Sequence, residues 1–194
     1  MLYTRKGDDG TSGLFGSAAR LPKDCPLFEA LGTVDELNSL LGVCFAKANT
    51  EALAAIATVG LESSIRSNEY TKVANLLREQ QQHLFVVQAE LAGADKRFDQ
   101  SQVEQLEATI ADLEQKFENP HAFVIAGGSE LSALLDYARA VSRRAERHVL
   151  LVREEYPTSP AAHKYLNRLS SFLYALARFA NTLASSLEQK PTYS

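Results

Sequence analysis

The stretch YARAVSRRAERH collects positive charge within an acidic chain. Arg139, Arg143 and Glu146 recur at spacings of four and three residues, so on a helix they share one face. Arg147 follows Glu146 on the same side, and Arg144 points elsewhere. Guanidinium groups suit phosphate or carboxylate, because their planar fork of N–H donors matches paired oxygens. The segment therefore indicates an anion site, although a solvated face with internal arginine–glutamate pairs would show the same spacing.

Two further segments place polar residues where a helical core does not need them. Asn167 and Arg168 interrupt an otherwise apolar helical pattern, and an amide is costly to bury without partners. Asn167 is therefore a ligand contact, a satisfied core amide or an exposed turn residue. Near the N-terminus, TRKGDDGTSGLFGS mixes glycines with Thr, Ser and Asp, which disfavours a helix and is also typical of a flexible leader. These glycines are Gly7, Gly10, Gly13 and Gly16.

Standard motifs for nucleotide or metal chemistry are missing from the sequence. It has no GxxxxGK[ST] loop, and GTSGLFG differs from the GxGxxG fingerprint and follows no predicted strand. A di-iron site would need paired Glu-x-x-His motifs, whereas Glu79 and His83 are four residues apart. Neither HExxH nor a Ser–His–Asp set can be placed. Any phosphate chemistry must therefore use the leader and the helix arginines.

The composition bounds the class of protein. With 194 residues, 45% of them hydrophobic and 23% charged, the chain predicts one globular domain over residues 1–194. A net charge of -4 argues against a DNA or RNA partner, which would need a broad basic surface. Cys25 and Cys44 have no CxxC spacing, the first residues lack the apolar core of a signal peptide, and no apolar run is long enough to span a bilayer. We therefore expect a cytoplasmic protein without a membrane partner.

Helical periodicity follows an irregular leader at residues 1–25. Thr33 and Glu36 form a capping-box pattern for a first helix, and the weaker stretch 51–68 predicts a short helix and a connection. Later apolar patterns predict helices at about 73–91, 101–117, 129–149 and 159–183, the last two capped by serines. No strand pair is expected. The predicted fold class is all-α, an antiparallel five-helix bundle over residues 26–190.

The chain resembles one family, the PduO-type ATP:cob(I)alamin adenosyltransferases, or corrinoid adenosyltransferases. Four motifs carry the resemblance in order: YTRKGDDGTSGLFG, EALGTVDELNSLLG, FVIAGGSELSALLDYARAVSRRAERHV and YLNRLSSFLYALAR. The resemblance implies a homotrimer of five-helix bundles with active sites between subunits. It implies transfer of the 5′-deoxyadenosyl group of ATP to the cobalt of reduced cobalamin, with triphosphate released and Mg²⁺ accompanying the ATP. An electron-donor protein and a cobalamin-dependent acceptor enzyme would be further partners.

The same resemblance implies roles for individual residues. In the leader, the ATP-binding residues would be Thr4, Arg5, Lys6, Gly7, Ser12, Gly13 and Lys23. Further nucleotide contacts would come from Arg143, Arg144, Ala145, Glu146, Arg147 and Asn167. The catalytic centre would comprise Arg143, Glu146, Phe123, Asp35 and Arg139. Within it, Asp35 and Arg139 would pair between neighbouring subunits, and Phe123 would lie below the corrin ring.

Physical chemistry gives these roles a reason. Glycines allow backbone N–H groups to close around a polyphosphate. An apolar ring at Phe123 would keep a ligand off the lower face of cobalt and exclude water, which makes reduction to Co(I) easier. Co(I) would attack the 5′ carbon of ATP, while Arg143, Lys23 and Mg²⁺ would stabilise the leaving triphosphate. No side-chain nucleophile is needed.

Several positions depart from the family pattern: Lys6, Asp9, Gly13, Ala126 and Ser142. These departures affect the leader contacts more than the reaction. Two other functions stay open, namely a non-catalytic corrinoid or nucleotide carrier or sensor, and a structural bundle whose arginines form subunit contacts. A structural bundle has no need for the glycine-rich leader with Lys23. A sensor would keep the same pockets, so only an assay separates it from an enzyme.

Overall fold

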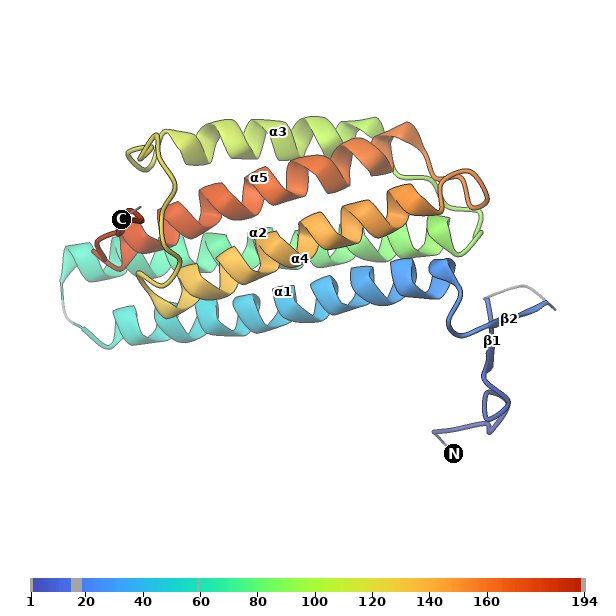
Figure 1. Cartoon of the computed structure of the whole chain (residues 1–194). Coiled ribbons are helices and arrows are strands. Elements are labelled where there is room, and N and C mark those ends of the chain that lie inside the picture. The colour runs from blue at the N-terminus through green and yellow to red at the C-terminus, as the bar shows by residue number, and fades with distance from the viewer. Residues whose placement is uncertain (1, 15–18, 59, 193–194) are drawn as a thin grey trace.

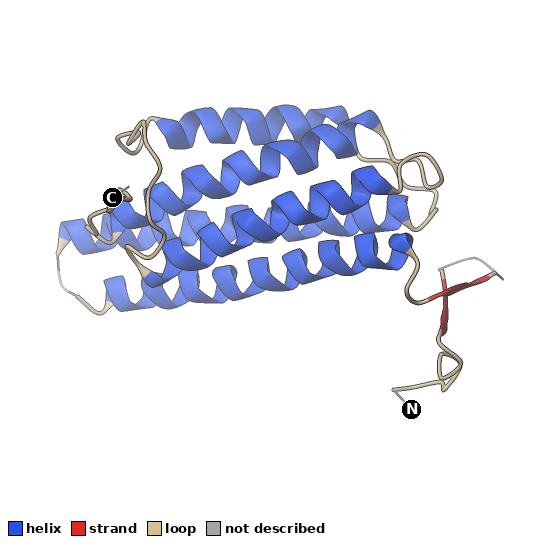
Figure 2. Ribbon diagram, in the orientation of Figure 1, coloured by secondary structure: helices blue, strands red, loops and turns tan. Residues whose placement is uncertain are grey.

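The computed structural model describes residues 2–14, 19–58 and 60–192, so Gly16 lies outside the described residues. Within them the chain forms a bundle of long helices and a small separate hairpin (Figure 2). The helices are α1 (Pro26–Ile56), α2 (Leu61–Leu91), α3 (Gln100–Glu114), α4 (Glu130–Leu151) and α5 (Pro160–Leu183). The predicted all-α class and five-helix bundle are confirmed.

The leader contains a strand pair that the sequence analysis did not expect. Strands β1 (Thr11–Gly13) and β2 (Arg20–Pro22) pair antiparallel. Asp9 Oδ1 accepts hydrogen bonds from the backbone N and the Oγ1 of Thr11, at 2.9 and 2.7 Å, and Arg20 Nε donates to the same Oγ1 at 2.7 Å. Polar side chains rather than apolar alternation stabilise this ladder, so the usual strand pattern is absent from the sequence.

Helix α1 begins before the predicted cap. Pro26 occupies its first turn, where a missing N–H costs nothing, and Leu27 is already buried. Thr33 lies inside the helix, where its hydroxyl donates to the carbonyl of Glu29 at 2.7 Å. The predicted capping box of Thr33 and Glu36 is therefore wrong.

The region predicted as a short helix and a connection is also different. In this region α1 continues to Ile56 and α2 already begins at Leu61. Ala52 and Ala55 are the residues of this stretch of α1 that face the core, and such small side chains give only a weak periodic signal. Gly60, just before α2, has φ 142°, a value that favours glycine.

Other helix boundaries follow the predicted caps. The Oγ of Ser129 accepts from the backbone of Ser132 at the start of α4, and Ser159 does the same for Ala162 in α5, both at 3.2 Å. Helix α3, predicted from about residue 101, begins at Gln100, where Asp99 is the cap and forms a complete capping box with Gln102.

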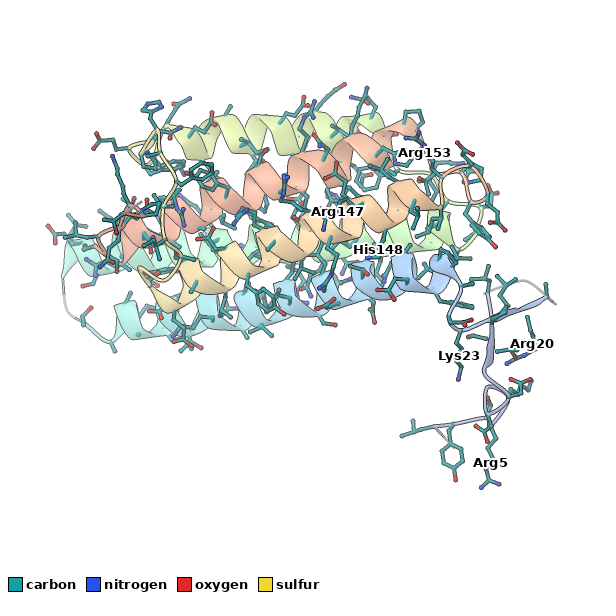
Figure 3. All side chains as sticks on the ribbon, in the orientation of Figure 1. Arg5, Arg20, Lys23, Arg147, His148 and Arg153 are labelled. Atoms are coloured by element: carbon teal, nitrogen blue, oxygen red, sulfur yellow. The ribbon has the colours of Figure 1, made fainter. Side chains whose placement is uncertain are left out.

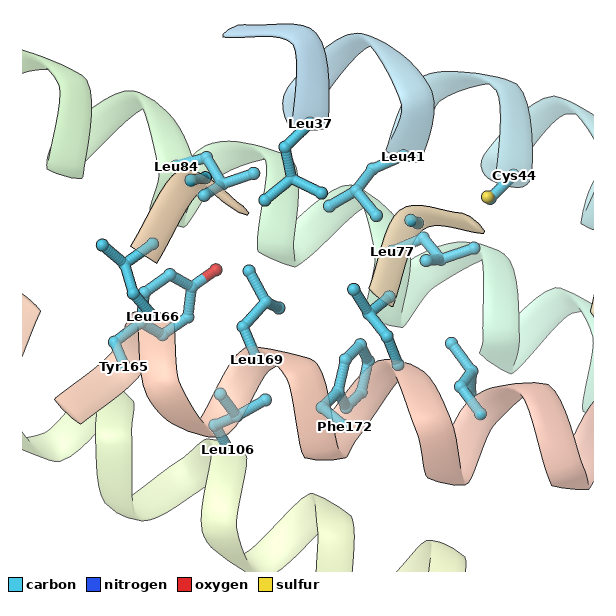
Figure 4. Close-up of a cluster of buried hydrophobic side chains, with 14 of the residues drawn as sticks. Leu37, Leu41, Cys44, Leu77, Leu84, Leu106, Tyr165, Leu166, Leu169 and Phe172 are labelled. Carbon is cyan, nitrogen blue, oxygen red and sulfur yellow. The ribbon is translucent and has the colours of Figure 1, made fainter. Parts of the chain in front are cut away.

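Helix α5 is central, with α4, α3 and α2 packed around it, and α1 covers α2 and α4 (Figure 1). Leucines from α1 and α2 meet Leu169 and Phe172 of α5 in the core (Figure 4). Tyr165 is wholly buried in this cluster, and its hydroxyl donates to Gln80 Oε1 at 3.1 Å. This rigid packing fixes the faces of α4 and α5 that carry the polar residues.

Helix α1 also contains an 18-residue window with a mean hydropathy of 1.2, enough by length and composition to cross a membrane. The expectation that no run is apolar enough is therefore corrected. One such helix is a weak indication, because core helices satisfy the same criterion. The buried face of α1, which includes Leu37 and Leu41, packs within the bundle.

Candidate functional site

Two adjoining cavities lie along α4 and α5, and Arg139 and Tyr174 line both of them. The first, of about 310 Å³, also includes Arg143. The second, of about 390 Å³, includes Phe123 and Arg178. The structure thus brings three predicted catalytic residues, Arg139, Arg143 and Phe123, to two cavities that share part of their lining.

Phe123 belongs to the connection between α3 and α4, and its side chain is 81% exposed. Its neighbour Ile125 is 51% exposed. A large apolar side chain open to water at the rim of a cavity favours a ligand with an apolar surface. This placement agrees with, but does not test, a position below a corrin ring.

A buried ion-pair network lines the same cavity as Phe123. Arg178 and Asp136 are 3% and 5% exposed and pair with each other. Asp136 Oδ1 also accepts from Arg139 Nε at 3.2 Å, and Arg178 stacks over Tyr174 with its guanidinium carbon 4.9 Å from the ring centre. Sequence reasoning missed Asp136, Tyr174 and Arg178. The sequence did offer a signal, because α4 and α5 each place one charged residue among buried apolar positions. Buried charges are rarely unpaired, so these two residues could have been predicted to pair with each other.

Arg143 and Arg147 are exposed, and neither forms an ion pair or hydrogen bond with any residue that the structure describes. Arg147 lies along α4 toward α5 (Figure 3). Arg144 turns the other way and pairs with Glu36 of α1, as the helical spacing predicts. Ala145 is fully buried, so its methyl group faces the core and neither cavity. Two free guanidinium groups are therefore available to an anion on the α5 side.

Glu146 and Asn167 meet across α4 and α5. Asn167 Nδ2 donates to Glu146 Oε1 at 2.8 Å, and its Oδ1 accepts from Arg168 Nη1 at 2.8 Å. Arg168 in turn donates to Glu107 of α3 at 2.9 Å. Asn167 is exposed, so the core-amide interpretation is wrong. The pair presents a carboxylate and an amide at the surface beside the free arginines.

Hydrogen bonds from Lys23 hold the leader in a defined turn. Lys23 Nζ donates to the carbonyl of Gly7 at 2.7 Å, and a Cβ at Gly7 would lie 2.9 Å from that Nζ. The φ of 81° at Gly10 lies in the left-handed region, and its carbonyl accepts from Lys23 N at 2.9 Å. Glycine is thus favoured at Gly7, where a Cβ would crowd Lys23 Nζ and the carbonyl of Thr11, and at Gly10 for backbone geometry.

Within one chain, the leader does not reach the cavities. It extends beyond the end of the bundle at the start of α1 (Figure 1), and its cations Arg5, Arg20 and Lys23 lie there, away from Arg147 (Figure 3). The remaining predicted leader residues are also on this arm, with all but the half-buried Ser12 exposed: Thr4, Lys6, Ser12 and Gly13. The structure therefore separates the two predicted halves of the ATP site.

Asp35 is exposed on α1 and has no ion pair or hydrogen bond with the described residues. Arg139 is engaged with Asp136 of its own chain. A pairing of Asp35 with Arg139 between subunits stays a prediction, because it concerns a neighbouring molecule.

Some residues that depart from the family pattern form hydrogen bonds within the chain. The Oγ of Ser142 is buried and donates to the carbonyl of Arg139 at 2.8 Å. Hydrogen bonds from Thr11 lower the pKa of Asp9, which therefore stays ionised close to Arg20. The carbonyl of Lys6 accepts from Arg20 Nη2 at 2.5 Å. Nothing in the structure explains Ala126.

A comparison with protein families decides the relationship: the model for cobalamin adenosyltransferase matches residues 2–180. The chain belongs to the cobalamin adenosyltransferase family. Among curated members, the corrinoid adenosyltransferase of Citrobacter freundii is 36% identical, with 93% of this chain and 95% of the relative aligned. The corrinoid adenosyltransferase PduO of Salmonella typhimurium is 35% identical over 91% of this chain, which spans only 48% of that longer relative.

A solved member of the adenosyltransferase family has the same fold. A variant of the PduO-type ATP:corrinoid adenosyltransferase from Lactobacillus reuteri, complexed with cobalamin and ATP, superimposes with a TM-score of 0.80. It is 28% identical, and the alignment covers 100% of both chains. The likeness therefore includes both the leader and the bundle of this chain.

Proposed function

We propose that this protein transfers the 5′-deoxyadenosyl group of ATP to the cobalt of reduced cobalamin and releases triphosphate. One observation carries the proposal: Arg143, free of partners, and Phe123 line adjoining cavities in a member of the cobalamin adenosyltransferase family. A cation suited to a leaving phosphate chain thus stands near an apolar ring suited to a corrin.

The reaction requires charge stabilisation more than covalent catalysis by the protein. A bond forms between cobalt and the 5′ carbon, and the bond from that carbon to the triphosphate oxygen breaks, leaving its electron pair on the triphosphate. Arg143 has no acidic partner among the described residues, so no ion pair must break before it binds phosphate. Such a group stabilises developing charge with little reorganisation.

We assign the adenosine part of ATP to the surface around Glu146 and Asn167. The 2.8 Å hydrogen bond between them holds both side chains in fixed orientations. A carboxylate accepts hydrogen bonds from ribose hydroxyls, and an amide can bind hydroxyls or a base edge. Their proximity to Arg143 along α4 would place the ribose and the phosphates next to each other.

The cavity beside Phe123 would hold the corrin. The exposed ring would exclude water and a lower ligand from the cobalt, which favours reduction. Asp136 and Arg178, which line the same cavity, pair with each other, so neither buried charge stands alone when no ligand is bound. Arg139 and Tyr174, which line both cavities, would lie where the nucleotide meets the corrin.

A homotrimer would complete the ATP site. The leader of one chain lies away from its own Arg147 on α4 (Figure 3), so we propose that a neighbour's leader covers α4. Exposed apolar side chains on α1 and α4, such as Val43 (50%) and Tyr137 (56%), support burial of this face between subunits. Unpaired Asp35 would then meet the neighbour's Arg139.

Mg²⁺ would accompany ATP and neutralise phosphate charge. Residues 2–14, 19–58 and 60–192 contain no group of three or more His, Cys, Asp or Glu arranged to hold a metal. The residues nevertheless fit Mg²⁺, because Mg²⁺ bound to nucleotide phosphates needs only one or two carboxylates. Glu146 on α4 would supply one.

An electron-donor protein would supply the electron that reduces the corrinoid from Co(II) to Co(I), and a cobalamin-dependent enzyme would take up the product. Free Cys25 and Cys44 are compatible with the reducing cytoplasm that this chemistry favours.

The test is an absorbance assay with ATP, Mg²⁺ and chemically reduced cobalamin. A light-sensitive alkyl product that requires both protein and ATP is the expected result. Arg66→Ala, which removes an exposed arginine of α2 outside both cavities, is the matched control and should keep full activity. Binding of both substrates without product would instead identify a carrier or sensor.

A further inference from the structure

We infer that the segment after α5, residues 185–192, positions Phe123 for the corrin step, and that Glu188 is the residue that anchors it. We call this segment the C-terminal strap. The inference rests on the proposed function, because it assigns a task to the strap within that reaction. The family model ends at residue 180, before the strap begins.

The connection that carries Phe123 has little support of its own. It runs between α3 and α4 without regular secondary structure, and His121 and Gly127 have φ values of 45° and 121°. Among the described residues, one backbone hydrogen bond joins the middle of this connection to another segment: Ile125 N donates to the carbonyl of Gln189 at 2.8 Å. An exposed side chain on such a segment is held only as well as its backbone.

The strap lies next to this connection because the chain reverses direction after α5 (Figure 1). Ser185 has φ 52°, a left-handed value that is costly for a residue with a Cβ. Ser186 N then donates to the carbonyl of Asn181 at 2.9 Å. A costly conformation persists where the surrounding contacts enforce it, and here the strap turns back to meet Ile125 in the connection before α4.

Glu188 fixes the strap to the bundle. Its Oε1 accepts from Asn181 Nδ2 at 2.8 Å and lies 2.6 Å from Arg178 Nε. The Arg178 side chain is 2% exposed, so this ion pair is well shielded from water. Without these contacts of Glu188, the next residue, Gln189, would be held less firmly in the position where its carbonyl accepts from Ile125.

The anchor and the cavity share the same arginine. Arg178 pairs with both Glu188 and Asp136, and it lines the cavity that contains Phe123. On the other side, a Cβ added to Gly128 would lie 2.7 Å from the amide of Asn181, so the connection also packs against the second partner of Glu188. One carboxylate thus organises the strap, the cavity lining and the Phe123 connection.

The experiment compares Glu188→Ala and Glu188→Gln with Lys190→Ala, an exposed strap residue that serves as control. The first readout is hydrogen exchange at the Ile125 amide, which needs no activity. The second is adenosylation of Co(II) cobalamin with a reductant, giving kcat and the KM for ATP. The third is the spectrum of bound Co(II), which reports whether a lower ligand is present. Thermal unfolding verifies that each variant is folded.

We expect Glu188→Ala to speed hydrogen exchange at the Ile125 amide. Bound Co(II) cobalamin should keep the spectrum of the form that still has its lower ligand. The kcat should fall at least about ten-fold, because a small misplacement of a positioning group costs that much. The KM for ATP should hardly change, since the nucleotide surface on Glu146 and Asn167 does not include the strap. Glu188→Gln keeps an acceptor for Asn181 and should be intermediate. Lys190→Ala should match wild type.

The inference is overturned if folded Glu188→Ala shows wild-type exchange at Ile125, or wild-type kcat and spectrum. An equal loss in Lys190→Ala, or a loss confined to ATP affinity, would overturn it as well. Failure of the proposed function looks different, because the wild-type protein itself would then form no alkyl product. If Glu188→Ala does not fold, Glu188→Gln and deletion of residues 187–194 give the same comparison.

Discussion

Replacing Arg143 with alanine should remove adenosyl transfer while leaving the fold intact. The side chain is exposed and makes no ion pair or hydrogen bond with the described residues, so its loss leaves no buried charge behind. Changes at such positions alter the free energy of unfolding by no more than about 0.5 kcal/mol. We therefore expect Arg143→Ala to unfold at the same temperature as the wild-type protein.

The effect on the reaction should be large. Removal of one preorganised donor to a developing negative charge costs about 10²–10³ in kcat, or about 2.7–4 kcal/mol. Arg143→Lys keeps the charge but loses the planar fork, so its activity should lie between those of wild type and Arg143→Ala. The assay is formation of the alkyl product from pre-reduced Co(I), which removes the reduction step from the measured rate.

Arg178→Ala provides the contrast, because this arginine is buried against Asp136. Breaking a buried pair costs about 3–5 kcal/mol, so this variant should unfold at a clearly lower temperature. If Arg143→Ala instead destabilised the protein as much as Arg178→Ala, or kept wild-type turnover, Arg143 would not be the free phosphate-binding group that its surroundings indicate.

Other variants and conditions give independent tests. Phe123→Ala should slow alkyl formation from Co(II) more than it weakens ATP binding, and unchanged turnover from Co(II) would contradict its role. Asp35→Asn should weaken the trimer or the site; an unaltered mass in solution together with unaltered kinetics would count against the subunit pairing. Burial lowers the pKa of His83 and His163, so the unfolded chain takes up protons first as the pH falls below about 6.5. The free energy of unfolding in urea should therefore be smaller at pH 5.5 than at pH 7.5, and equal values would refute this. Burial raises the pKa of the Cys44 thiol to about 12, so a thiol reagent at pH 8 should label half-buried Cys25 first, and faster labelling of Cys44 would show that this part of the core opens.

The helices were largely predictable because their buried faces repeat large apolar residues. The pattern of Leu166, Leu169, Leu173 and Leu176 is unambiguous, and all four are fully buried in α5. The prediction was wrong where small residues face the core, as at Ala52 and Ala55, since alanine also occurs on exposed surfaces. The leader hairpin was missed for a related reason: its bonds come from Asp9, Thr11 and Arg20 rather than from apolar alternation.

The candidate site was predictable in part. Helical spacing alone separated Arg143 from Arg144, and the structure gives them different surroundings. The meeting of Glu146 with Asn167 required knowledge of the register between α4 and α5, which depends on tertiary packing. The same holds for the pair of Asp136 and Arg178, which are 42 residues apart in sequence.

The most direct measurement is a structure of the oligomer with bound ATP. We predict that the triphosphate lies between Lys23 and Gly7 of one protomer and Arg143 of its neighbour, with the ribose beside Glu146. A triphosphate bound away from both the leader and α4 would contradict the proposed site.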